Sequence, residues 1–308
     1  MAELTKERFK KVAPDRFDKD VISRPTISYW GDAWRRLKKN PVAMFSLVLL
    51  ILCIIMTIVG PYIRGLDFVS VNGIKKNLGP SSEFWFGSDS LGRDLFSRVW
   101  MGARVSIIVA LVCTAIQIVI GCIYGGIMAY YGGIVDEVMM RILEIITSMP
   151  SLLITLLVMM VLEKSVGALV FAMCVTAWCG TARQMRGQIM QLRESEYVMA
   201  ADCLGASPMR IIIKHMIPNT LSILILNVAS SIPNYIFTEA SLSFLGMGLD
   251  SNSISLGVLI SNGRAALDLY PYQLFFPALV LCVIVLAFNL LGDGLRDEIG
   301  RASCRERV

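Results

Sequence analysis

The chain has 308 residues, of which 55% are hydrophobic and 17% are charged, and its net charge is +5. Its mean hydropathy of +0.63 is too high for a soluble domain of this length, because a soluble fold needs enough polar surface to cover its core. The cations cluster beside apolar segments, where anionic lipid and membrane orientation explain them. No interleaving of aromatic and basic residues points to nucleic acid as a partner.

Six apolar stretches are each long enough to cross the hydrocarbon core of a bilayer, which takes about 20 mostly apolar residues. The sequence therefore predicts an all-α integral membrane protein with six transmembrane helices. The first forty residues are polar and basic, so we expect the first stretch to be a permanent span rather than a cleavable export signal. The predicted spans cover about Val42–Ile63, Val105–Tyr130, Val138–Leu162, Gly167–Gly187, Thr220–Leu245 and Leu274–Leu295.

The placement of lysine and arginine predicts that both termini lie in the cytoplasm. The N-terminal segment is rich in cations, and the loop after the fourth span carries Arg193, Arg210 and Lys214, whereas the short loop after the third has only Lys164. The first outer loop, about Arg64–Arg104, also carries cations. Long loops obey the positive-inside rule less strictly, so the predicted topology stands.

Before the first span, Trp30, Trp34 and Leu37 recur at helical spacing beside four cations. This pattern is typical of a short interfacial helix, with aromatic rings at the lipid headgroups and cations toward the phosphates. A solvated basic tail is the alternative interpretation.

The polar stretch between the fourth and fifth spans is the most informative part of the sequence. It predicts a cytoplasmic hairpin of two short helices, Glu196–Leu204 and Pro208–Ile217. Gly205 fits the position just after a helix, where a positive φ costs glycine little. Ser207 fits an N-cap before a proline at the first helical position, and Pro218 is expected to end the second helix.

Small residues on this hairpin, Ala200, Ala201 and Gly205, permit close approach of another protein. The second helix carries an apolar stripe that we expect to pack against the spans. Two interpretations remain open: a knob that docks on a partner protein, and an amphipathic loop on the lipid surface. The stripe consists of Met209, Ile212, Ile213 and Met216.

Ala200-Ala201, three residues, Gly205 and the later Pro218 resemble the cytoplasmic coupling motif of ABC importer permeases. That motif usually has Glu where this chain has Met199, and Leu before the proline. The wider string is similar to the dipeptide/oligopeptide permease family, in which Tyr-Val-x-Ala-Ala and His-x-x-Pro-Asn are usual. The resemblance assigns ATPase coupling to Glu196, Tyr197, Ala200, Ala201, Asp202, Gly205, Ala206, Ser207, His215, Pro218 and Asn219.

Four other segments resemble the same family, in the same order along the chain. Their order and spacing, rather than any single motif, make the resemblance specific, and it extends from about Trp30 to Asp297. The segments are Gly87–Asp94 with Ser97 and Arg98, Tyr131–Gly133 with Asp136, Glu239–Gly246, and Asn289–Asp293.

The resemblance implies a permease subunit of an ABC importer that moves short peptides across a prokaryotic plasma membrane into the cytoplasm. The chain has no G-x-x-x-x-G-K-[ST] string, so it is not expected to be an enzyme; ATP and Mg²⁺ are expected on two partner ATPase subunits. The other implied partners are a second, homologous permease, an external peptide-binding protein and the lipid bilayer. The only histidine is His215 and the cysteines have no metal-like spacing, so no metal or cofactor is expected on this chain.

Polar groups inside membrane spans are costly in lipid and usually face a partner or a water-filled path. Gln117, Asn227, Asn234 and Glu239 are therefore candidates for the substrate pathway or its gate. For Glu239, near the outer end of the fifth predicted span, a carboxylate that reaches interfacial water is an equal alternative.

The sequence divides into a basic segment with the interfacial helix (1–41), the first span with its outer loop (42–104) and a five-helix permease core (105–297). Residues 298–308 depart from the family pattern, which continues toward Leu-Asp-Pro. Their peptide can be back-translated into a common sequencing adapter. We therefore expect the native sequence to end near Asp297 and interpret 298–308 as a non-native tail.

Three alternatives to a peptide importer remain. Within the ABC class, the solute is nickel or another small molecule, since related permeases share these motifs. An ion-coupled secondary transporter favours buried acids or broken helices that recur in two halves, and no clear internal repeat is visible. A membrane-anchored assembly protein fits the spans but not the ordered motifs.

Overall fold

The computed structural model describes residues 40–63, 69–249 and 253–305, together with Arg35, Lys38 and Gly65, with side chains as far as Arg296. The predicted interfacial helix around Trp30, Trp34 and Leu37 lies outside these residues. Five described helices are long and apolar enough to cross a membrane, which confirms the all-helical membrane fold. They are α2 (Pro41–Ile63), α3 (Leu95–Tyr131), α6 (Val166–Arg193), α10 (Leu221–Phe244) and α12 (Tyr272–Arg305).

The third predicted span is broken in two. Helix α4 (Gly133–Thr147) and helix α5 (Ser151–Val161) meet at an angle of 76°, and together they make the sixth span if the bent pair is one crossing. The break falls at Pro150, because proline lacks an N–H donor and disfavours helical conformation in the residue before it.

Three predicted spans, which correspond to α3, α6 and α12, are too short, and α12 continues past Leu295 to Arg305. Helix α3 begins at Leu95 rather than near Val105, because the Asp94 carboxylate caps it: its Oδ2 accepts hydrogen bonds from the Ser97 N–H at 2.9 Å and the Ser97 hydroxyl at 2.6 Å. Helix α6 continues past Gly187 to Arg193.

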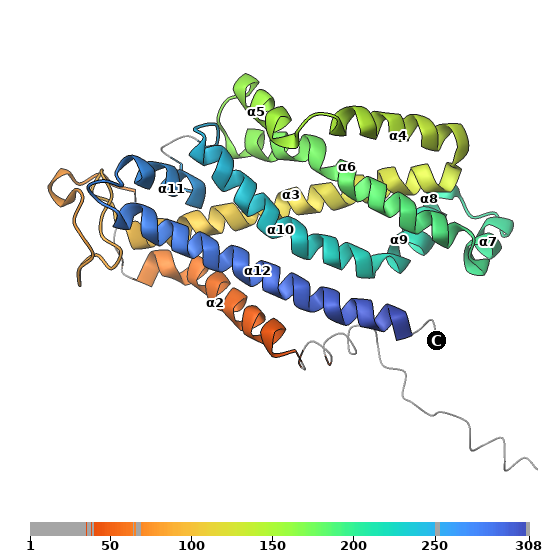
Figure 1. The fold of residues 1–308 in the computed structure, drawn as a ribbon, viewed down its shortest axis with the longest axis horizontal. Coiled ribbons are helices and arrows are strands. Elements are labelled where there is room, and N and C mark those ends of the chain that lie inside the picture. The colour runs from red at the N-terminus through yellow and green to blue at the C-terminus, as the bar shows by residue number, and fades with distance from the viewer. Residues whose placement is uncertain are drawn as a thin grey trace, which may run out of the picture.

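The two ends of the molecule differ (Figure 1). One end, which we call the loop end, carries residues 69–94 and the short helix α11 (Leu256–Ala265); within this loop lies the 3₁₀ turn η4 (Gly73–Lys75). The opposite end, the hairpin end, carries helices α7 (Glu196–Cys203) and α8 (Pro208–Ile211). The π-helical turn η5 (Ile212–Met216) and helix α9 (Ile217–Asn219) lead from there into α10.

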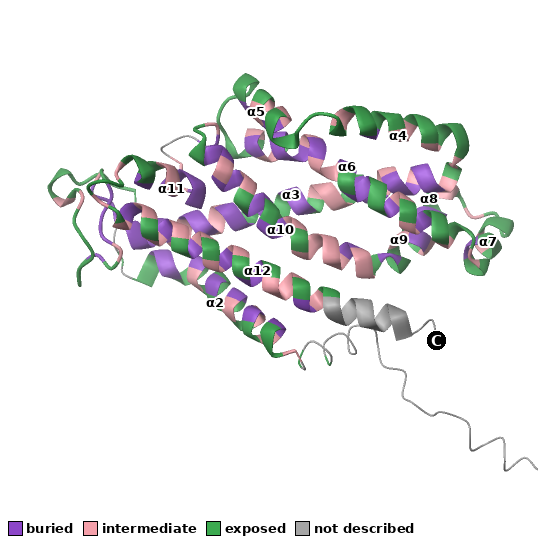
Figure 2. Ribbon diagram, viewed as in Figure 1, coloured by how far each residue is buried: buried purple, intermediate pink, exposed green. Residues whose placement is uncertain are grey.

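Helix α3 runs through the middle of the bundle and packs against α6 very closely. A Cβ atom added at Gly121 would lie 2.7 Å from the Thr181 side chain, and one added at Gly125 would lie 2.4 Å from the Ala182 carbonyl oxygen. Small residues four apart are a common device for bringing membrane helices together. Burial accordingly concentrates along α3 and on the inner sides of its neighbours, whereas α4 is mostly exposed (Figure 2).

Candidate functional site

The first helix of the predicted hairpin is α7, within one residue of its expected bounds. It ends as predicted at Gly205, whose φ is +77°. The Gly205 N–H donates to the Asp202 carbonyl at 2.9 Å, and the Ala206 N–H donates to the Ala201 carbonyl at 3.1 Å. These two bonds are the Schellman arrangement, which satisfies the last carbonyls of a helix and favours glycine at its end.

The second helix differs from its prediction in two ways. Ser207 occupies the N-cap position, but its side chain makes no capping hydrogen bond; its carbonyl accepts from Ile211 N–H at 3.0 Å instead. Pro218 does not end the helix, because the chain widens into the π turn η5 before it and remains helical through Asn219. The Asn219 side-chain amide then donates to the His215 carbonyl at 2.6 Å.

Buried apolar side chains fix the hairpin to the bundle. Val198, Ile211, Ile212 and Met216 belong to one cluster with residues of α3 and α6, and each is at most 3% exposed. The predicted stripe is therefore half right. Met209 and Ile213 face outward, and Ile211 takes their place in the core, because a π turn shifts the face that the helix presents.

The exposed surface of the hairpin combines small and apolar residues with the charged residues Glu196, Asp202, Arg210 and Lys214. Ala200 and Gly205 are exposed, whereas Ala201 is half-buried against the core. A Cβ atom at Gly205 would meet no atom of the described residues within 4 Å. Around this surface stand Tyr197, Met199, Leu204, Met209 and Ile213, all exposed, with Leu204 at 88%. Apolar side chains exposed beyond the spans are typical of a protein–protein contact.

Two contacts join the hairpin to the end of α3, and a third joins the end of α6 to it. The Tyr130 hydroxyl donates to Asp202 Oδ1 at 3.1 Å, and Arg193, the last residue of α6, donates to the Ala129 carbonyl at 3.4 Å. Ile212 packs on Gly126, where a Cβ atom would lie 2.7 Å from its Cγ2. A displacement of the hairpin therefore bears directly on α3, the central helix.

Gln117 and Asn234, two predicted pathway residues, meet at a cavity of about 430 Å³ between α3, α5, α6 and α10. Gln117 bridges two helices: its amide donates to Thr181 Oγ1 at 2.7 Å, and its carbonyl oxygen accepts from the Tyr235 hydroxyl at 2.9 Å. The other lining residues are Ser151, Leu152, Thr155, Met173, Thr176, Ala177, Ser231 and Thr238.

The other two pathway candidates lie elsewhere. Asn227 is on α10 outside this cavity, and its buried Nδ2 has no hydrogen-bond partner among the described residues. Glu239 is fully buried and accepts hydrogen bonds from Ser106 at 2.8 Å, Ser255 at 2.7 Å and Ser243 at 3.1 Å. It therefore ties α3, α10 and α11 together and does not reach interfacial water.

Two family models match the chain. Residues 117–302 match the family of the binding-protein-dependent transport system inner membrane component. The matched range contains both the hairpin and the cavity. Residues 28–80 match the N-terminal transmembrane domain of oligopeptide transport permease C. The chain belongs to the binding-protein-dependent permease family. It is thus a multi-pass transmembrane component of a bacterial ABC transporter.

Similar curated permeases cover nearly the whole chain. The chain is 40% identical to the oligopeptide transport system permease protein OppC of Bacillus subtilis, over 97% of this chain and 98% of the relative. It is 42% identical to the dipeptide transport system permease protein DppC of the same organism, over 91% and 88%. It is 35% identical to the glutathione transport system permease protein GsiD of Escherichia coli, over 88% and 89%.

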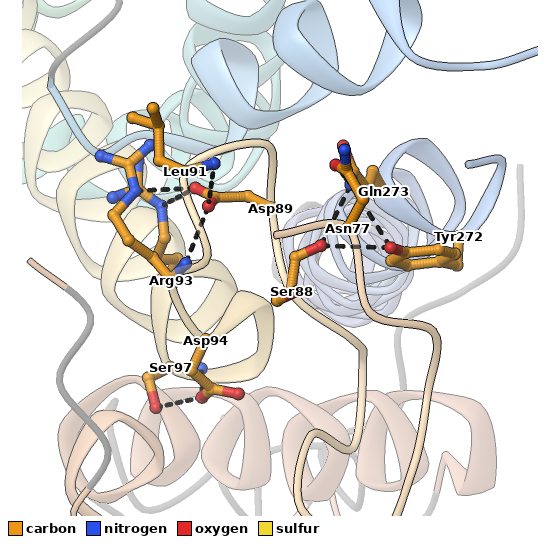
Figure 3. Close-up of polar contacts among 10 residues, drawn as sticks. Asn77, Ser88, Asp89, Leu91, Arg93, Asp94, Ser97, Tyr272 and Gln273 are labelled. Carbon is orange, nitrogen blue, oxygen red and sulfur yellow. Dashed lines mark hydrogen bonds and ion pairs between the residues drawn. The ribbon is translucent and has the colours of Figure 1, made fainter. Parts of the chain in front are cut away.

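The permease motif at Gly87–Asp94 forms a compact turn at the loop end (Figure 3). The Asp89 carboxylate accepts hydrogen bonds from the N–H groups of Leu91 and Arg93, each at 2.9 Å, and from Arg93 Nε at 2.7 Å. The guanidinium of Arg98, on α3, lies 3.6 Å from the same carboxylate. The motif residues therefore organise a buried ion cluster.

The same turn is attached to the start of α12. The Ser88 carbonyl accepts hydrogen bonds from the Tyr272 hydroxyl at 3.2 Å and from Gln273 Nε2 at 3.0 Å (Figure 3). Gln273 Nε2 also donates to Asn77 Oδ1 at 2.9 Å. These bonds join segments nearly 200 positions apart in the sequence.

The sequence interpretation missed the contacts that position the hairpin end of the permease. Arg186 on α6 pairs with both carboxylate oxygens of Asp136 on α4, at 2.5 Å each. A carboxylate and a guanidinium near the ends of adjacent spans are the available signal, since charges there usually pair. Tyr130 gave no such signal, because its partner Asp202 lies 72 positions away.

Proposed function

We propose that this permease moves short peptides into the cytoplasm as a membrane subunit of an ABC importer, driven by ATP hydrolysis on partner subunits. The observation that carries the proposal is the exposed apolar hairpin, which is fixed by a buried cluster to α3 and α6. The names of the oligopeptide and dipeptide permeases at 40% and 42% identity support peptides as the substrate.

The proposed assembly contains a second, homologous permease, two cytoplasmic ATPase subunits and an external binding protein. The hairpin end faces the cytoplasm and receives one ATPase. Both termini lie on that side, in agreement with the direction of α12, which runs from the loop end toward the hairpin end (Figure 1). The loop end then faces the binding protein.

The hairpin acts as a lever in this proposal. Closure of the ATPases displaces α7, and the displacement reaches the central helix through the Tyr130–Asp202 hydrogen bond and the contact of Ile212 with Gly126. Packed helices respond by shifting between discrete arrangements rather than by bending continuously. The spans thereby alternate between outward-facing and inward-facing states.

The decisive experiment is peptide-stimulated ATP hydrolysis by the reconstituted assembly, with Ala200→Trp as the test variant. Ala200 is exposed on α7, so an indole there blocks docking without entering the core. It is a cleaner test than Gly205→Trp, because Gly205 has a φ of +77° and any side chain there adds backbone strain. Ala200→Ser keeps the side chain small and is the matched control.

We expect Ala200→Trp to abolish the stimulation and Ala200→Ser to retain it. Full stimulation in both variants would contradict the coupling role. Solute uptake by this chain without any ATPase would instead favour the secondary transporter. Uptake of Ni²⁺ in place of peptide by the unmodified assembly would favour the small-solute alternative within the ABC class.

A further inference from the structure

The cavity that Gln117 and Asn234 share lies at the middle of the bundle, far from both the hairpin and the loop end. Asn234 is the fourteenth residue of α10, a helix of 24 residues, and α5 contributes its first turn, directly after the break at Pro150. The lining is polar but uncharged. Its hydrogen-bonding side chains are Gln117, Ser151, Thr155, Thr176, Ser231, Asn234, Tyr235 and Thr238.

Several of these polar side chains have no hydrogen-bond partner among the described residues. The side-chain amide of Asn234 and the hydroxyls of Thr176 and Ser231 make no hydrogen bond to any described residue. Asn234 is exposed, whereas Thr176 is only 9% exposed. Polar groups inside a membrane protein that lack partners are costly. They are retained where water or a ligand supplies the missing hydrogen bonds.

Helix α4, which leads into α5, has an exposed side that does not suit lipid. Glu137, Arg141 and Glu144 are all exposed on this helix, and α4 lies next to α5 on the same side of α6 (Figure 1). A charged side chain costs about 3 kcal/mol in the middle of a bilayer. This side of the bundle, which includes the α5 residues that line the cavity, therefore faces a water-filled path or another subunit.

We propose that this cavity holds the main chain of a peptide in transit by means of its uncharged amide and hydroxyl groups. The inference rests on the proposed peptide transport and adds the site and the mode of recognition. Main-chain amides need donors and acceptors but no counterion, which is what this lining provides. Because every peptide has the same main chain, recognition of this kind tolerates different side chains.

The test is uptake by proteoliposomes that contain the complete importer, measured per ATP hydrolysed. The probes are tritiated Ala-Ala-Ala and Ala-Lys-Ala, which share a main chain. The test variant combines Asn234→Leu with Thr176→Val, which removes two hydrogen-bonding groups at nearly constant volume. Asn234→Gln keeps an amide at the same position. Ser230→Ala with Thr114→Val is the control pair outside the cavity, since those hydroxyls bond the carbonyls of Leu226 and Ala110 in their own helices.

We expect the test variant to lower uptake per ATP about tenfold for both peptides, which corresponds to two neutral hydrogen bonds. Asn234→Gln should recover part of the loss, and the control pair should stay within about twofold of the unmodified importer. Unchanged uptake in the test variant would overturn the proposal, as would a loss confined to one peptide. If the unmodified importer takes up neither peptide, the proposed function itself fails, and this inference falls with it.

Discussion

The hydroxyl of Tyr130, in the last turn of α3, donates a hydrogen bond to the Asp202 carboxylate of α7 at 3.1 Å. This bond joins the central helix directly to the segment that the family resemblance assigns to ATPase contact. Buried apolar packing also fixes the hairpin, through a cluster against which the Tyr130 ring itself packs. The Tyr130–Asp202 bond is therefore a specific polar link between α7 and α3.

Tyr130→Phe removes this link and leaves the ring in place. Because the bond is partly exposed to solvent, it contributes only about 1 kcal/mol. We expect a small change in the thermal unfolding midpoint and a several-fold fall in peptide uptake per ATP hydrolysed. Tyr131→Phe is the matched control, since the Tyr131 hydroxyl makes no hydrogen bond in the described part of the chain. Equal effects of the two substitutions would argue against a coupling role for this bond.

Gly125→Ala tests the close crossing of α3 and α6. An added Cβ atom would come 2.4 Å from the Ala182 carbonyl oxygen and 3.0 Å from the Arg186 nitrogen, and backbone atoms cannot move aside as a side chain can. We expect a destabilisation of about 1–3 kcal/mol, seen as a lower unfolding midpoint of the purified assembly.

Gly180→Ala provides the contrast for that substitution. Gly180 lies in α6, and a Cβ atom there meets nothing within 4 Å in the part of the chain that the structure describes. Alanine is the better helix former by about 1 kcal/mol, so Gly180→Ala should leave the midpoint unchanged or raise it. A midpoint that falls equally in both variants would show that the α3–α6 contact is looser than the structure has it.

Much of the architecture follows from the sequence because the governing patterns are local. The apolar character of the spans, the turn at Gly205 and the first helix of the hairpin each depend on a few neighbouring residues, and the structure confirms them. The start of α3 and the course of the second hairpin helix differ from the prediction, because a side-chain cap and a π turn set them. Pro150 is evident in the sequence, but a proline within a span can either kink the helix or divide it in two, and the sequence does not show which. That outcome depends on what packs around it.

The sites were predictable only in part, since their contacts join distant segments. Gln117 and Asn234 were found as polar residues within apolar helices, and the fold brings them to one cavity. Glu239 was found by the same signal, yet its carboxylate is enclosed by serines from three helices. The sequence shows which residues within an apolar span are polar. It does not show whether a serine on another helix lies close enough to hydrogen-bond such a residue.

Asp89→Ala tests whether the motif at the loop end is structural. The substitution removes the carboxylate that Arg93 and Arg98 approach at 2.7 and 3.6 Å, and all three side chains are at most 13% exposed. Breaking a buried ion pair by removing one partner typically costs about 3–5 kcal/mol. We expect a large fall in the amount of assembled protein and in its unfolding midpoint.

Glu83→Ala is the control for that experiment in the same loop. It removes an ion pair with Lys75 whose side chains are 39% and 56% exposed, and such pairs contribute about 0–1 kcal/mol. The assembly should therefore tolerate it. If Asp89→Ala assembles and unfolds like Glu83→Ala, the motif does not act through the buried cluster.

Substitution of Glu239 distinguishes a structural role for its carboxylate from a role as a gate. Glu239→Leu deprives the hydroxyls of Ser106, Ser243 and Ser255 of their shared acceptor, and the Ser106 hydroxyl also accepts from the first N–H of α11, at Leu256, at 3.3 Å. Buried groups left unsatisfied cost about 1–3 kcal/mol each.

We therefore expect Glu239→Leu to lower the unfolding midpoint strongly and to loosen α11, which hydrogen–deuterium exchange over residues 255–265 would register. Glu239→Gln retains one carbonyl oxygen as an acceptor and should be milder. Glu163→Leu, at an exposed glutamate, should change stability by no more than about 0.5 kcal/mol. If the Glu239→Leu assembly instead has an unchanged unfolding midpoint but transports peptide without ATP, the carboxylate belongs to a gate. A gate residue controls the passage of solute and need not hold the helices together.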